Sequence, residues 1–97
     1  MDLGNTIRTI RNRKGFTQIE FANKCNITQS YLSQIESNKK EPNISTVKII
    51  SKNLDIPLPV IFFLSMNESD IDETKVESFK VINKSVKTLI TDILLTP

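Results

Sequence analysis

The sequence predicts an all-α protein, with five short helices in its first two thirds and one long amphipathic helix near its C-terminus. Two observations carry this prediction. Apolar residues recur three and four positions apart, which is the spacing that places them on one face of a helix. Residues that favour helix starts precede these stretches, and residues that tolerate a left-handed backbone follow several of them.

The first helix is expected over about residues 3–14. Asp2 precedes it as an N-cap, and Gly15 follows it as a left-handed C-cap. Ile7 and Ile10 lie three residues apart and continue an apolar stripe that begins at the start of the helix. We expect this stripe to face the core.

Two short helices separated by a tight break are expected between residues 17 and 38. Thr17 and Glu20 form a capping box, in which each side chain bonds the backbone N–H of the other residue. Thr28 is a second N-cap. Asn26 lies between the two helices and can adopt the left-handed conformation that ends a helix.

The second of these helices presents a polar face without formal charge, whereas a face that only keeps a helix soluble usually carries Lys and Glu. Amides and hydroxyls suit hydrogen bonding to base edges in the major groove, where Gln can pair with adenine through two bonds. A plain solvated helix face is the alternative. The uncharged polar residues are Gln29, Ser30, Tyr31, Ser33, Gln34 and Ser37.

The segment TQIEFANKCNITQSYLSQIE, residues 17–36, resembles the DNA-binding core of Cro/repressor-type helix–turn–helix regulators, the XRE family. The similarity runs from about Leu3 to Leu64. It implies a lambda-repressor-like DNA-binding domain of five helices, in which the third is the recognition helix. The combination of matching residues is specific. They are Arg11, Thr17, Gln18, Ala22, Ile27, Ser33, Ile35, Glu36, Pro42, Leu54 and Ile56.

The chain departs from this family at three turns, where Gly is usual and Asn26, Asn38 and Asp55 stand instead. Asn and Asp are among the non-Gly residues that best adopt a positive φ. We therefore expect the same turns, in a slightly strained form.

The resemblance also implies which residues contact DNA. Gln29 and Ser30 in the first turn of the recognition helix, and Gln34 one turn further, are expected to contact bases, together with Ser33. Phosphate contacts are expected from the start of helix two, from the recognition helix and from the loop after it, where solvated loop residues are the alternative. The expected phosphate-contacting residues are Gln18, Tyr31, Asn38, Lys39 and Lys40.

A structural ion pair is implied in the same way. In the family, an Arg of the first helix pairs with the Glu that follows the recognition helix, and Arg11 and Glu36 occupy these places. Ordinary surface charges are the alternative. Gln18 is additionally expected to brace Gln29.

Two further helices complete the predicted domain. The fourth is expected to start near Ser45, its cap, and to run to about Asn53. The fifth, about residues 58–64, is apolar nearly all round and must be buried on more than one side. The predicted division is therefore a helix–turn–helix domain over residues 1–64, a linker over 65–71 and a C-terminal element over 72–97.

The C-terminal element is expected to be a long amphipathic helix from about Asp72 to Leu95. Its apolar stripe fits heptads, which predicts a homodimer through this helix. The alternative is a helix that folds back over the fifth helix and covers Phe62 or Phe63. The predicted dimer or partner-binding residues are Phe79, Ile82, Val86, Leu89 and Ile93.

Composition argues against an enzyme, a metal site or a cofactor. The chain has no His, one Cys and two Gly, and so lacks the commonest general base, a Cys-based zinc cluster and a glycine-rich phosphate loop. It shows no signal-peptide pattern and no apolar run of membrane-spanning length. A cytoplasmic location without a membrane partner is expected.

Charge is divided unevenly along the chain. Residues 1–52 hold nine Lys and Arg against four acids, and residues 53–97 hold four Lys against seven acids. This predicts a basic half that binds DNA and an acidic half kept away from phosphate. The predicted function is a sequence-specific regulator of transcription, a repressor that binds a palindromic double-stranded operator as a homodimer. The alternative is an antitoxin-like or adaptor module whose acidic C-terminal helix binds a protein partner.

Overall fold

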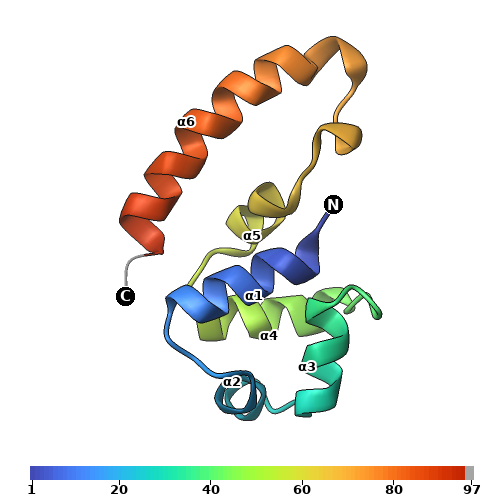
Figure 1. Cartoon of the computed structure of the whole chain (residues 1–97), viewed down its shortest axis with the longest axis vertical. Helices are drawn as coiled ribbons and strands as arrows, with labels where there is room; N and C mark the ends of the chain where they lie inside the picture. The colour runs from blue at the N-terminus through green and yellow to red at the C-terminus, as the bar shows by residue number, and fades with distance from the viewer. Residues whose placement is uncertain (96–97) are drawn as a thin grey trace.

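The computed structural model describes residues 1–95, which contain helices joined by turns and loops, with no strand among them (Figure 1). Five helices form the N-terminal domain, two short 3-10 turns follow, and a long helix completes the described chain. The helices are α1 (Leu3–Arg13), α2 (Gln18–Lys24), α3 (Gln29–Glu36), α4 (Ile44–Leu54), α5 (Leu58–Ser65) and α6 (Val76–Leu94); the turns are η1 (Glu68–Asp70) and η2 (Glu73–Lys75).

The core of the domain is the meeting point of the apolar stripes of α1 to α5. Each stripe follows the three-and-four spacing that the sequence predicts, because this spacing brings side chains to one face of a helix. The expected inward positions of α1, Ile7 and Ile10, are both buried. The buried apolar residues of the five-helix domain are Ile7, Ile10, Phe21, Ala22, Cys25, Leu32, Ile35, Val47, Ile50, Leu54, Ile56 and Ile61.

The helix starts follow the capping chemistry of the sequence in most places. The Asp2 side chain accepts from the N–H of Asn5, and Thr17 makes both bonds of its capping box. Thr28 caps α3. The prediction for α4 was wrong in detail: the helix begins at Ile44, and the amide oxygen of Asn43, rather than a Ser45 hydroxyl, takes the free N–H of the first turn.

The three residues that replace Gly at turns all have a left-handed backbone, as predicted. The φ angles are 56° at Asn26, 60° at Asn38 and 56° at Asp55. Each stands just after a helix, where such a residue reverses the chain and frees the next segment to pack back. Gly15, with φ of 85°, does the same after α1.

Helix α6 runs back along the domain, and one of its faces packs against it. The ring centroid of Phe79 lies 6.3 Å from that of Phe63 on α5. Ile90 is buried, and Val86 packs against the core. The helix begins at Val76, later than predicted, because Asp72 caps the separate turn η2. Figure 1 shows α6 at the end of the molecule opposite α2 and α3.

The N-terminus ties the linker to the domain. The amino group of Met1 lies 3.0 Å from a carboxylate oxygen of Asp70 in η1. The backbone N–H of Asp2 donates to the carbonyl oxygen of Ser65, at the end of α5, over 2.7 Å. These contacts hold the chain where it leaves the domain. Among residues 1–95, no helix is long and apolar enough to cross a membrane.

Candidate nucleic-acid interface

Helices α2 and α3 are joined by a tight turn that aims α3 outward from the domain. The N–H of Ile27 donates to the carbonyl oxygen of Ala22 over 3.0 Å, which closes the turn around the left-handed Asn26. Helix α3 buries Leu32 and Ile35 against the core. Its other side is open to solvent, as required of a helix that enters a groove.

The predicted base-contacting residues lie on this open side. Gln29, Ser30 and Ser33 are exposed, and Gln34 is half-buried. None of them carries a formal charge, so the face offers amide and hydroxyl groups only. The structure thus brings the four predicted residues together on one helix, and their contacts with bases stay a prediction.

A buried ion pair fixes the end of α3 to α1. Arg11 Nε lies 2.7 Å from Glu36 Oε2, and Arg11 Nη2 donates to Glu36 Oε1 over 2.9 Å. The Arg11 side chain also donates to the carbonyl oxygen of Phe16 over 2.8 Å. The predicted pair is therefore confirmed, and it is bidentate, which gives it directional as well as electrostatic strength.

Glu36 has two further partners that the sequence did not predict. Arg8 Nη2 donates to the backbone carbonyl of Glu36 over 3.2 Å, which places a cation at the C-terminal end of α3. Gln18 Nε2 donates to Glu36 Oε1 over 3.1 Å. The contact between Gln18 and Glu36 joins residues eighteen positions apart, and no local pattern signals a contact of that kind.

Gln18 also contacts the first predicted base-contacting residue. Gln29 Nε2 lies 3.4 Å from Gln18 Oε1, so the predicted bracing of Gln29 by Gln18 is present. This distance is long for an amide hydrogen bond, so the contact is weak. A phosphate contact from Gln18 stays a prediction.

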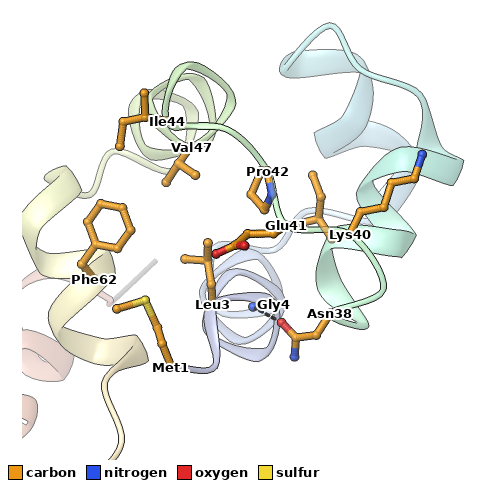
Figure 2. A pocket seen from close by; sticks show the side chains of 11 residues that line it. Met1, Leu3, Gly4, Asn38, Lys40, Glu41, Pro42, Ile44, Val47 and Phe62 are labelled. Atoms are coloured by element: carbon orange, nitrogen blue, oxygen red, sulfur yellow. Dashed lines mark hydrogen bonds between the residues drawn. The ribbon is translucent and has the colours of Figure 1, made fainter. Parts of the chain in front are cut away.

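The loop after α3 is fastened to the start of α1 by Asn38. Its Oδ1 accepts from the N–H of Gly4 over 3.0 Å, the bond drawn in Figure 2, and its Nδ2 donates to Asp2 Oδ1 over 2.8 Å. The amide of Asn38 is thus engaged within the protein. This structural role was not predicted from the sequence, and a phosphate contact from Asn38 stays a prediction.

The other predicted phosphate-contacting residues remain available on the surface. Lys39 and Lys40 are exposed in the loop, and Tyr31 is half-buried on α3. Lys40 Nζ lies 6.0 Å from the centre of the Tyr31 ring, which places the ammonium group near the recognition helix. A cavity of about 520 Å³ lies behind this loop, between the chain start, α4 and α5 (Figure 2).

Four of the seven acidic groups of the C-terminal half lie in the linker, ahead of α6. Residues 68–73 hold four acids, whereas α6 contains three Lys and two acids. The expectation of an acidic C-terminal helix was therefore wrong, because the charge count over half the chain hid where the acids stand.

Comparison with known proteins places this geometry in a family. The sequence profile of the helix–turn–helix family matches residues 7–61, which span most of α1 to α5. The chain belongs to the XRE-type helix–turn–helix family. It is a DNA-binding transcriptional regulator.

Two curated relatives of this regulator are similar in sequence. The immunity repressor protein of Bacillus phage phi105 is 30% identical over 97 residues, covering 88% of this chain and 67% of that protein. The HTH-type transcriptional regulator SinR of Bacillus licheniformis is 33% identical over 72 residues, covering 73% of this chain. The match covers 61% of SinR, so this regulator corresponds to about three fifths of that protein.

Solved structures share the fold. The wild-type restriction–modification controller protein C.Esp1396I is 33% identical, with a TM-score of 0.60 over 65% of this chain and 82% of that one. The clp gene regulator ClgR of Corynebacterium glutamicum, 18% identical, has a TM-score of 0.64 over 93% of this chain and 87% of its own. The second likeness concerns the fold alone, but its extent reaches beyond the five-helix domain.

Proposed function

We propose that this regulator is a sequence-specific repressor that binds a two-fold symmetric operator as a homodimer. The observation that carries the proposal is the exposed, uncharged face of α3, held at a fixed angle by the buried pair of Arg11 and Glu36. Such a helix suits insertion into a major groove. The name of the phage relative, an immunity repressor, supports repression rather than activation.

Base readout is proposed for the N-terminal half of α3. Gln29 and Ser30 lie in its first turn, the part that enters deepest in this docking geometry. Ser33 and Gln34 continue the same side. An amide can bond adenine through two hydrogen bonds, and a good pair of this kind contributes roughly 1–3 kcal/mol of discrimination.

Contacts with the sugar–phosphate backbone of DNA are proposed for groups around this helix. Lys39 and Lys40 provide charge, and Gln18 and Tyr31 provide uncharged donors. Contacts of this kind set register and affinity without selecting a base. Asn38 contributes indirectly, because its bonds to Gly4 and Asp2 hold the lysine-bearing loop in place.

The homodimer is proposed because two recognition helices about 34 Å apart reach successive major grooves, and a single copy with a modest basic surface would bind weakly. The α6 surface, defined as Val81, Ile82, Leu89 and Ile93, is apolar and exposed, as an interface with a second copy requires. The other two predicted residues, Phe79 and Val86, are used inside the chain.

A second candidate function is a protein-interaction module. It is favoured by the place of the α6 surface, which lies on the helix opposite α3 (Figure 1). A partner bound there would not obstruct DNA. This candidate and the homodimer both use α6, and the oligomeric state distinguishes them.

The test of readout starts from duplexes that the protein selects from a random library. Gln29→Ala should weaken binding to the selected duplex by roughly 1–3 kcal/mol and relax base preference at one position. The matched control is Lys75→Ala, in the linker turn far from α3, which should change neither. If Gln29→Ala weakens selected and random duplexes equally, Gln29 does not read a base.

A further inference from the structure

A continuous line of polar contacts joins the buried ion pair to the exposed tip of α3. Arg11 Nη2 and Gln18 Nε2 both donate to Glu36 Oε1, over 2.9 Å and 3.1 Å. Gln18 Oε1 then faces Gln29 Nε2 at 3.4 Å. The line therefore runs from a carboxylate with 1% of its side-chain surface exposed to a side chain on the DNA-facing surface.

The chemistry of Glu36 gives this line a direction. A carboxylate paired with a guanidinium has only acceptor atoms, whereas a Gln amide has a donor end and an acceptor end. Gln18 must therefore turn its NH₂ group toward Glu36, which leaves its carbonyl oxygen toward Gln29. Gln29 in turn presents its NH₂ group to Gln18, across the longer contact of 3.4 Å. The orientation of an amide is usually an open choice, but here the carboxylate fixes it at Gln18 and, through the weaker second contact, favours one orientation at Gln29.

We propose that Glu36 is a positioning residue for base readout, which sets the orientation of the Gln29 amide through Gln18 and so favours adenine at one operator position. This inference rests on the proposed role of Gln29. Adenine presents an acceptor at N7 and a donor at N6 in a fixed order. An amide in one orientation matches that order, and the reversed amide opposes donor to donor.

The bond to Gln18 does not prevent this pairing. An NH₂ group has two hydrogens, so one can bond Gln18 while the other and Oε1 meet the base. Gln34 provides an internal comparison on the same helix. Within residues 1–95, its side-chain amide makes no hydrogen bond, so Glu36 should not influence the base that Gln34 meets.

The experiment measures the ratio of Kd values for duplexes that differ at a single base pair. The first probe is the duplex selected by the wild-type protein. The others differ from it by one base pair, either at the position where Gln29→Ala relaxes base preference or at the position where Gln34→Ala does. Glu36→Gln removes the acceptor-only group, and Gln18→Met cuts the line while leaving the ion pair intact. Both should lower the ratio at the Gln29 position about threefold, the weight of one hydrogen bond, and leave the Gln34 position unchanged.

Ile50→Val is the matched control for loss of stability. It removes one buried methyl group on α4, away from the line of contacts, so it should lower the melting temperature and retain the ratio. Binding is measured well below the melting temperature of every variant; Gln18→Met alone decides the matter if Glu36→Gln does not fold. The proposal is overturned if either Gln18→Met or a folded Glu36→Gln weakens all duplexes by one common factor. An unchanged base preference in Gln29→Ala would instead overturn the readout role itself.

Discussion

Arg11 and Glu36 join α1 to the end of the recognition helix through two hydrogen bonds, Nε to Oε2 at 2.7 Å and Nη2 to Oε1 at 2.9 Å. Both side chains are almost fully buried. In such a place each charge depends on the other, because a lone buried charge loses its water and gains nothing in exchange. The pair thus fixes the angle at which α3 leaves the domain, and removal of either residue alone leaves a buried charge without its partner.

The first prediction follows from that dependence. Glu36→Ala should lower the stability by about 3–5 kcal/mol, because it leaves the Arg11 guanidinium buried without its carboxylate. The double change Arg11→Met, Glu36→Leu should recover part of this loss, since two apolar side chains need no partner. Urea unfolding measures both. If the effects of Arg11→Met and Glu36→Leu, each measured alone, simply add in the double variant, the two residues do not interact energetically.

The second prediction contrasts two left-handed residues. Asp55→Gly should stabilise the protein by about 1 kcal/mol, because Gly adopts a positive φ without the steric cost borne by other residues, and because an acid is removed from the C-terminal end of α4. Asn38→Gly should instead destabilise it, since the bonds to Gly4 and Asp2 are lost. Thermal unfolding of the two variants gives the comparison. Equal shifts would show that the Asn38 side chain contributes nothing.

The third prediction concerns salt. Lys39→Ala and Lys40→Ala should each weaken binding to selected and random duplexes alike, because a phosphate contact carries no sequence information. Each should also reduce the slope of log K against log salt by about one. Titration at several salt concentrations measures the slope. If a variant keeps the wild-type slope, the lysine that it lacks does not contact a phosphate.

Features that depend on neighbours in the chain could be predicted from the sequence. The capping box involves two residues only three positions apart, Thr17 and Glu20. The left-handed turns depend on the backbone of one residue each, Asn26 and Asn38. The core positions followed from helical spacing alone. The pairing of Arg11 with Glu36 spans the domain, and only the family resemblance indicated it.

The features that could not be predicted depend on side chains that meet across the fold. Gln18 reaches Glu36, and Asn38 reaches Gly4 and Asp2, because α1, α2 and the loop after α3 converge. Nothing in the composition of these polar residues distinguishes an internal bond from a DNA contact. The same holds for α6, whose single apolar stripe is divided in the structure between an inner face and an outer one.

The fourth prediction uses the contact between Asp2 and the loop. A hydrogen bond from the Asn38 amide, together with one from the N–H of Asn5, lowers the pKa of the Asp2 carboxyl. A lowered pKa in the folded state adds stability above the unfolded value, about 3.9, and this stability is lost as the pH falls through the folded value. Asp2→Asn should therefore flatten the dependence of unfolding free energy on pH below about 4. Asn38→Ala should flatten it as well, and a dependence as steep as that of the wild type in both variants would exclude a contribution from Asp2.

The last prediction concerns the α6 surface. Replacing Ile82, Leu89 and Ile93 with Ser keeps the inner contacts of α6 and removes exposed apolar area that a second copy would cover. The triple variant should shift toward monomer in light scattering and lose affinity for the selected duplex, while its helical signal stays close to that of the wild type.

Val86→Ser is the matched control, because it weakens the packing of α6 on its own domain and leaves the α6 surface intact. A chain truncated after Ser65 should behave like the triple variant in its oligomeric state, since it lacks the whole of α6. If the triple variant stays fully dimeric and binds the duplex as before, the copies pair elsewhere. The outer face of α6 is then better explained by capture of a different protein, on the end of the molecule that DNA leaves free.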